Sequence, residues 1–502
     1  MIRPVPMGYV DRRPLSPGYR RRLPVWVNWP LFGILALVPV ALAVVVPPEH
    51  LLGTVLAYAN LMLIGGASIY FACQGTLQGL IPVLFLAWLA AAWPLASIYF
   101  AIQSPDLVYK ALAAERPFLL GNVRLQLVTM AFLVPYLSTL FLFAGRPKPW
   151  KNAAVFVRTD RRVAAIALAI AAAAITFNAV SKVRPLPGIL QYLADGGYHY
   201  LHGLTLVVGV LFTSLTFPTR AMAAGFLVAA GTFYSVGNAR GLAALPIAIF
   251  LTGLIFLSDL NRRWKIWIVT GALVCFPLAL VVSNTTRIVT KTIGFSDLDT
   301  RLHALNNWRD VLSETSLLTS TFGRLFFAGG HTIIVLSPEH YPYVDLSIER
   351  YLIEFFMRML PKRFFGDLYY SEQPNRILRG YGFLITEETS IPLSLPGSLY
   401  MLGGVLPVVL GGIAIGLVHI GLGGCLRAAG RRSRYLPLFV FAMCAPDFVW
   451  GQNFDPITHT RSLVWSGVSA WALYQLFLRP LIGEPLPGRR TAPPRRLVRP
   501  AA

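Results

Sequence analysis

Long apolar runs separated by short polar segments make up most of the chain between Trp29 and Leu478. The runs do not alternate, and they are rich in Leu, Ala, Val and Gly, which is typical of helices rather than strands. A bilayer span needs about 20 mainly apolar residues whose backbone polar groups are satisfied within a helix. The pattern therefore predicts an all-α fold, a polytopic membrane helix bundle of about 12 transmembrane helices.

The predicted spans share this length and composition, and every Lys and Arg lies between them or at their edges. The spans are 29–46, 51–72, 80–102, 125–144, 163–180, 198–217, 221–236, 241–257, 266–283, 396–423, 436–450 and 462–478. They divide the chain into a basic N-terminus (1–28), helices 1–9 (29–283), a large loop (284–395), helices 10–12 (396–478) and a Pro- and Arg-rich tail (479–502) that is expected to be disordered.

The distribution of basic residues predicts the orientation of these spans. Cytoplasmic segments of inner-membrane proteins carry the excess of Lys and Arg. With the N-terminus inside, the predicted cytoplasmic segments hold 26 of the 44 basic residues, and the short outside segments hold seven. We therefore predict a multi-pass protein of a bacterial inner membrane, with both termini cytoplasmic and the loop 284–395 in the periplasm.

Composition narrows the class of protein further. The chain is 55% hydrophobic and only 13% charged, so the net charge of +22 is not carried by a soluble module. We interpret this charge as a topology signal that also attracts anionic lipids, and we expect no nucleic-acid partner. Motifs of nucleotide-driven or zinc-dependent enzymes (GxxxxGK[ST], HExxH, paired CxxC) and GxSxG are absent, so neither a metal nor another cofactor is expected.

The long outside loop has the composition of an ordered segment. Its eleven basic residues nearly balance its twelve acidic ones, and it contains aromatic and apolar runs. Within 347–360, charged residues recur every four positions opposite an apolar face, which predicts an amphipathic surface helix. A second helix is predicted over 301–313, so the large periplasmic loop should be partly helical.

Candidate site residues all lie on the predicted outer face. Arg240 precedes the eighth span, where a guanidinium group can bind phosphate oxygens in a bidentate manner or can simply lie at the interface. The loop adds further arginines that could bind phosphate or sugar groups, among them Arg287, Arg301, Arg309, Arg324, Arg376 and Arg379. A pyrophosphate attached to a lipid would suit such arginines at the depth of the headgroups.

Candidate acids and bases lie in the same loop. Its histidines, His303, His331 and His340, have an unperturbed pKa near neutrality. Glu387 and Glu388, in TEETSIP just before the tenth span, can act as general bases or as helix-start charges. The tenth span begins SLPGSLYMLGGVLPVVLGG, and its glycines permit close helix packing or an opening.

Together these features resemble the O-antigen polymerase family, the oligosaccharide repeat-unit polymerases, which are multispanning membrane glycosyltransferases. The resemblance is carried by NARG at the eighth span, MLPKRFFGD in the loop, and TEETS followed by PGSLYMLGG. It implies an enzyme that needs no metal or nucleotide. At the periplasmic face it would join undecaprenyl-pyrophosphate-linked repeat units into O-antigen or exopolysaccharide.

The implied partners are lipid-linked oligosaccharide substrates and membrane lipids, with a chain-length regulator and a flippase as possible protein partners. Arg240 and the loop arginines would bind pyrophosphate or glycan, and Glu387, Glu388 or His331 would deprotonate the acceptor hydroxyl. O-antigen ligase has a similar layout but usually carries a His late in the loop, and here no His lies between His340 and His419.

Two functions other than that of an enzyme remain open. A lipid-linked oligosaccharide flippase should have charged residues lining a cavity within the membrane, whereas Asp447 is the main charged residue inside the predicted spans. A scaffold protein would leave the arginine-rich loop without a role. The resemblance and the long loop favour the polymerase.

Overall fold

The structure is a computed structural model, and nearly all of the residues that it describes are helical. It describes residues 45–46, 48–74, 76–90, 94–103, 115–143, 158–183, 201–236, 240–258, 260–261, 263–268, 270–271, 353, 357, 395–401, 403–433, 435–450 and 456–484. The predicted all-α class is confirmed for these residues.

Four of the described helices contain a segment long and apolar enough to cross a membrane. The segments are His50–Ala72 in α2 (Pro48–Cys73), Asn122–Phe143 in α6 (Glu115–Phe143), Asp160–Ser181 in α7 (Arg158–Val183) and Val405–Gly430 in α20 (Val405–Arg432). Shorter apolar helices are Leu77–Ala87, Leu245–Leu257 and Leu436–Val449. A membrane helix protein is thus supported, while the number twelve stays a prediction.

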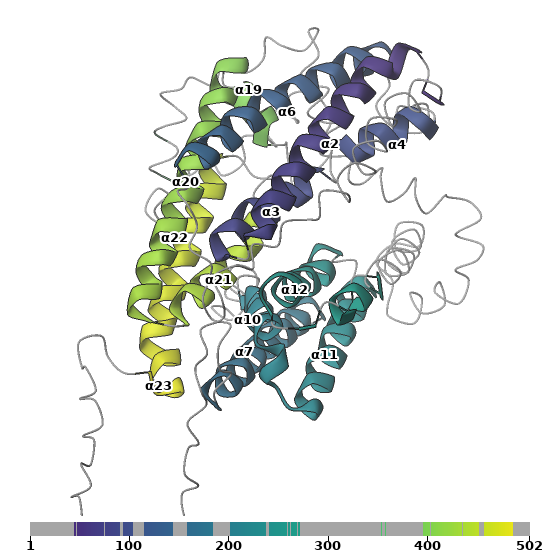
Figure 1. Ribbon diagram of the computed structural model, residues 1–502. Helices are drawn as coiled ribbons and strands as arrows, with labels where there is room; N and C mark the ends of the chain where they lie inside the picture. The colour runs from purple at the N-terminus through teal and green to yellow at the C-terminus, as the bar shows by residue number, and fades with distance from the viewer. Residues whose placement is uncertain are drawn as a thin grey trace, which may run out of the picture.

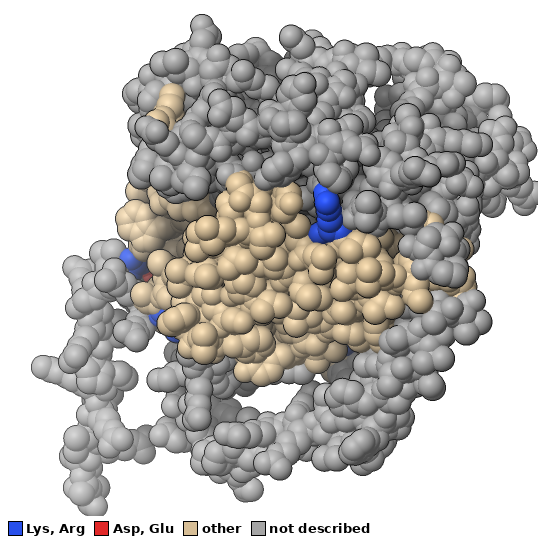
Figure 2. Space-filling model, turned by 90° about the horizontal axis from the view of Figure 1, so that it is seen from above, with Lys and Arg blue, Asp and Glu red and all other residues tan. Residues whose placement is uncertain are grey.

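Large apolar side chains cover the outside of these helices. Leu142 is 75% exposed, Leu406 is 67% exposed and Trp471 is 55% exposed. Figure 2 shows a described surface that carries very few Lys, Arg, Asp or Glu residues. Apolar patches of this extent are suited to lipid rather than to water.

Glycines bring α6 and α20 into close contact. A Cβ at Gly412 would lie 2.5 Å from the carbonyl oxygen of Phe132, and one at Gly416 would lie 3.0 Å from the side chain of Thr139. Small residues four positions apart let two membrane helices approach to backbone contact. Close packing, one of the two roles predicted for the glycines of this segment, is therefore confirmed at these positions.

Helix α21 (Leu436–Trp450) lies at the centre of the molecule, between two groups of helices. One group contains α2, α6, α20, α3 (Leu77–Ala90) and α22 (Pro456–Leu473); the other contains α7, α10 (Thr205–Val210), α11 (Phe217–Val236) and α12 (Arg240–Thr252) (Figure 1). Every side chain of α21 described from Leu436 to Phe448 is buried. A helix that is apolar all round belongs in such a central position.

The predicted span 198–217 is described from Leu201 onwards, as a run of short helices rather than one α-helix. The described part consists of η2 (His202–Leu204), α10 and η3 (Phe212–Ser214), and the chain becomes extended at Leu215. Gly and β-branched residues in TLVVGV are weak helix formers. In addition, the Gly203 backbone lies against the Ala442 carbonyl, and Gly209 lies against Phe250 next to η4 (Gly253–Leu257), so tertiary packing sets the local path.

One other predicted span is divided, and a second is described only in part. Of the span 80–102, the structure describes α3, the helical residues Pro94 and Leu95, and α4 (Ala96–Gln103), while residues 91–93 lie outside the described part. The span 396–423 becomes α19 (Leu395–Met401) and α20, separated by Gly403 and Gly404, which have φ angles of 153° and 79°. Side chains rarely tolerate these angles, so glycine permits the turn.

Helices α19 and α20, which are joined by this turn, lie side by side. A Cβ at Gly411 would touch the Leu399 side chain, although the two residues lie on opposite sides of the Gly403–Gly404 turn. Leu395 is fully buried, and α19 also contacts α6 and α22. Helix α19, which follows the predicted outer loop in the sequence, is therefore packed inside the bundle.

Several segments predicted to be cytoplasmic meet at one end of the molecule, here called the basic end. Arg161 Nε donates to the Ser214 carbonyl, and Tyr435 donates to the Asp160 carboxylate at the start of α7. Ser433 donates to Glu484, which follows η8 (Tyr474–Leu478) and α23 (Arg479–Ile482). These contacts agree with the grouping of segments by charge, and their side of the membrane remains a prediction.

Candidate functional site

A buried polar site lies where α6, α20 and α22 meet. His419, near the middle of α20, is 2% exposed, and its Nδ1 lies 2.9 Å from the hydroxyl of Tyr136 in α6. The site follows from the glycine packing, because the close approach at Gly416 brings the two helices together one turn before His419. Both side chains are buried, so their polar atoms need hydrogen-bond partners inside the protein.

His459 completes the centre of the site. It lies in the first turn of α22, it is fully buried, and its Nε2 is 3.2 Å from Nε2 of His419. In a neutral pair, one Nε2 must carry a hydrogen and the other must accept it. If His419 Nε2 donates, its Nδ1 accepts from Tyr136; if Nε2 accepts, Nδ1 donates. The three groups therefore form a hydrogen-bonded chain that can reverse its direction.

Aromatic rings surround the histidine pair. Phe85 of α3 lies 5.0 Å from the His419 ring and 5.5 Å from the His459 ring, measured between centroids. Phe448 of α21 meets His419 edge to face at 5.5 Å. This packing holds both imidazoles in place and surrounds them with apolar groups. Among the described residues, no three His, Cys, Asp or Glu side chains converge, so these residues alone supply no metal centre.

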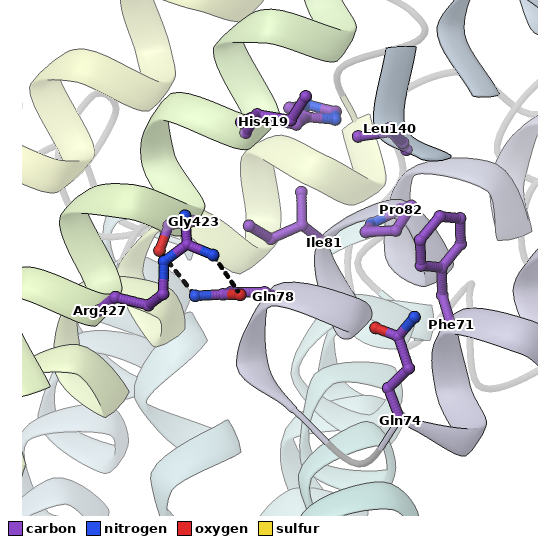
Figure 3. Close-up of a pocket in the computed structure, with 10 residues that line it drawn as sticks. Phe71, Gln74, Gln78, Ile81, Pro82, Leu140, His419, Gly423 and Arg427 are labelled. Atoms are coloured by element: carbon purple, nitrogen blue, oxygen red, sulfur yellow. Dashed lines mark hydrogen bonds between the residues drawn. The ribbon is translucent and has the colours of Figure 1, made fainter. Parts of the chain in front are cut away.

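A small hollow leads from His419 towards the basic end. Its lining includes Gln74, Gln78, Gly423 and Arg427, and Figure 3 shows His419 at one end with Gln78 and Arg427 at the other. Gln78 Nε2 donates to the Gly423 carbonyl at 2.8 Å, and Arg427 donates to Gln78 Oε1 at 3.3 Å. The volume open to water is ≈ 30 Å³, enough for a single water molecule and too small for a sugar.

More polar groups lie on the buried side of α22 and of η8, which follows it. Ser466 donates to Asp447 of α21 at 2.6 Å, and Tyr474 contacts both Ser433 and Glu484 at the basic end. Asp447 is 3% exposed and does not line the hollow. Buried ionisable groups therefore lie at several levels beside α22, from His459 in its first turn, past Asp447 of α21, to Tyr474 at the basic end.

A second polar cluster joins α2, α4 and α6 near the end of the bundle opposite the basic end. Asn60 donates to Gln126 Oε1 at 3.0 Å, and Gln126 donates to Ser97 at 3.2 Å and to Asn122 at 3.3 Å. Ser97 donates to Asn122 at 2.5 Å. All four residues are buried and uncharged, so the cluster fixes three helices to one another without a buried charge.

One more buried hydroxyl belongs to the short helix α19. Ser398 of α19 is 9% exposed, and its Oγ has no hydrogen-bond partner among the described residues. A buried donor without a partner is costly unless another group binds it. Ser398 is therefore a candidate ligand-binding residue on the segment that follows TEETSIP.

The structure describes little of the site predicted from the sequence. Arg240 is the first residue of α12, and its side chain is outside the described residues. Also outside them are the other predicted site residues: Arg287, Arg301, Arg309, Arg324, Arg376, Arg379, His303, His331, His340, Glu387 and Glu388. In the predicted loop helix 347–360, Ile353 and Met357 are helical. The role of each predicted residue stays a prediction.

Sequence reasoning missed the histidine pair. His419 was considered only because it ends the stretch without histidine, and His459 was not considered. A usable signal existed, because an ionisable residue inside an apolar helix is a functional candidate by default.

Comparison with protein-family models, with curated proteins and with solved structures finds no match for this chain.

Proposed function

We propose that this protein is a membrane glycosyltransferase that polymerises lipid-linked oligosaccharide repeat units at the outer face of a bacterial inner membrane. The main structural support is helix α19, which follows the predicted outer loop and packs against α6, α20 and α22. Because α19 is joined to that loop, a substrate bound by the loop would lie close to these helices. Backbone at membrane depth is tolerated where it is buried in protein or lines a cavity.

The chemistry of the proposed reaction suits the residue types on this face. The growing glycan leaves its undecaprenyl pyrophosphate carrier and is transferred to a hydroxyl of an incoming lipid-linked repeat unit. The pyrophosphate carries away the negative charge, so arginines such as Arg240 would stabilise it. A base, with Glu387, Glu388 and His331 as candidates, would accept the hydroxyl proton. Ser398 would donate a hydrogen bond to a glycan oxygen.

A second candidate function is a proton-coupled flippase for the same lipid-linked substrates. The observation in its favour is the set of ionisable side chains buried within the helices, His419, His459 and Asp447. Such residues commonly form proton relays in transporters. The hollow beside His419 is too small for a glycan, and for this reason we place the polymerase first.

Deletion of the gene, scored by the length and location of the glycan, tests the proposal. We expect the deletion strain to keep single repeat units on their lipid carrier at the outer face and to lose the long polymer. Reintroduction of the full-length gene should restore the polymer. Retention of all repeat units at the inner face would instead support the flippase, and polymer of normal length would exclude both functions.

A further inference from the structure

The histidine pair has the geometry of a site that binds a proton. Two imidazoles in hydrogen-bond contact can share one added proton, because the imidazolium donates a charge-assisted bond to its neutral neighbour. Two protonated rings whose Nε2 atoms lie 3.2 Å apart would repel each other in these apolar surroundings. Such a pair therefore accepts one proton and resists the second.

The position of the pair gives the proton a route. His419 lines the hollow, which has room for one water molecule and is bordered by Gln74, Gln78 and Arg427 towards the basic end. Water in the hollow can give a proton to the pair and take it back. The side-chain amides of Gln74 and Gln78 carry both donors and acceptors, so they can orient such a water in either state.

We propose that His419 and His459 form a buried proton-binding site. One ring gains a single proton at Nδ1, donates its Nε2 hydrogen to the neutral partner ring, and exchanges the added proton with water in the adjacent hollow. In the uptake step, a hydronium ion in the hollow loses its proton to the neutral pair and becomes water. Release is the reverse. No oxidant, reductant or second substrate is required. The proposal does not depend on the glycosyltransferase activity, because it rests on the described residues alone.

Neighbouring elements contribute few groups that could compete for the proton. Tyr136 of α6 is bound to His419, and Tyr400 is the only ionisable described residue on α3 and α19. On α21, Asp447 is bound to Ser466, and Cys444 contacts the Leu463 carbonyl. Both contacts lie about 6 to 10 Å along α22 from His459.

Two further charged groups lie on the same helices as the pair. Arg427 is two turns from His419 along α20 and is bound to Gln78, and Arg461 lies two residues after His459 in α22. Each disfavours a nearby positive charge, and exposure of Arg427 to solvent weakens its effect. The hydrogen bond between the two rings favours the single proton, whereas their burial among apolar side chains opposes a charge there.

Nitrogen NMR of the full-length protein, labelled with ¹⁵N-histidine and placed in lipid nanodiscs, tests the proposal between pH 8 and pH 5. We expect one pair of coupled imidazole signals to take up one proton together. His419→Gln and His459→Gln should each remove this coupled signal. His202→Gln, a change at another fully buried histidine, should leave it intact.

The wild-type titration alone can overturn the proposal, whether or not the variants fold. Two rings that stay neutral throughout, or that titrate independently, would exclude a shared proton. Gly423→Val tests the route, because its side chain would be added beside Gln78, where a Cβ lies 3.3 Å from Gln78 Cγ. We expect this variant to slow proton exchange with solvent without removing the shared signal, and unchanged exchange would exclude the hollow as the route.

Discussion

Gly412 of α20 and Phe132 of α6 are in backbone contact, since a Cβ at Gly412 would lie 2.5 Å from the Phe132 carbonyl oxygen. We expect Gly412→Leu to separate α6 from α20 and to lower stability by about 1 to 3 kcal/mol or more, because a packed interface cannot absorb the added side chain. Thermal unfolding of the purified protein in detergent measures the effect.

Gly421→Leu is the matched control on the same helix. A Cβ at Gly421 meets nothing within 4 Å, and the residue is exposed. Its substitution should leave the unfolding temperature unchanged or raise it slightly, because Leu is the better helix former. Equal unfolding temperatures for the two variants would show that the α6–α20 contact does not need glycine.

Gly404 makes the turn between α19 and α20 possible, with a φ of 79° and a ψ of −144°. We expect Gly404→Ala to lower stability by about 1 to 3 kcal/mol, since this region of backbone space is essentially restricted to glycine. Protease sensitivity of the α19 segment, measured alongside thermal unfolding, should increase.

Gly424→Ala is expected to change stability in the opposite direction. Gly424 lies inside α20 and has only an Arg427 side-chain atom near its Cβ position, at 3.9 Å. Alanine there should stabilise the helix by about 0.5 to 1 kcal/mol. If both alanine variants stabilise the protein, the positive φ at Gly404 is not a feature of the native state.

Substitution of Ser398 distinguishes a role in ligand binding from a role in folding. Its hydroxyl is buried without a described partner, so we expect Ser398→Ala to keep or slightly raise stability while it lowers polymer formation. Ser97→Ala is the contrasting variant, because the Ser97 hydroxyl bonds to both Asn122 and Gln126. It should cost about 1 kcal/mol of stability. A Ser398→Ala protein of full activity would remove Ser398 from the proposed site.

The sequence allowed the membrane class and several helix positions to be predicted, because a lipid-facing helix needs an apolar composition whatever its neighbours are. It was least successful where tertiary packing or glycine decides the backbone path. The break between α19 and α20 depends on Gly403 and Gly404, and hydropathy does not detect it since both sides are apolar.

The candidate site could not be predicted from the sequence for the same reason. The pair His419–His459 joins residues 40 positions apart in the chain, and no local pattern in the sequence indicates that they meet. Their contact follows from how α20 and α22 pack against α6 and α3. Arg240, in contrast, could be singled out from the sequence because charge patterning alone predicts that it lies at a membrane surface.

Arg240 provides the last test, which concerns the proposed reaction. We expect Arg240→Ala to abolish polymer, with roughly 10²- to 10³-fold slower transfer, because a lost charge-assisted donor leaves the departing pyrophosphate less stabilised. Arg240→Lys should retain partial activity, since lysine keeps the charge but not the bidentate geometry. Arg263→Ala changes an exposed arginine on the predicted cytoplasmic side and should leave the polymer normal. Glycan length and membrane protein level are measured together, and polymer of normal length in Arg240→Ala cells would exclude this residue from the site.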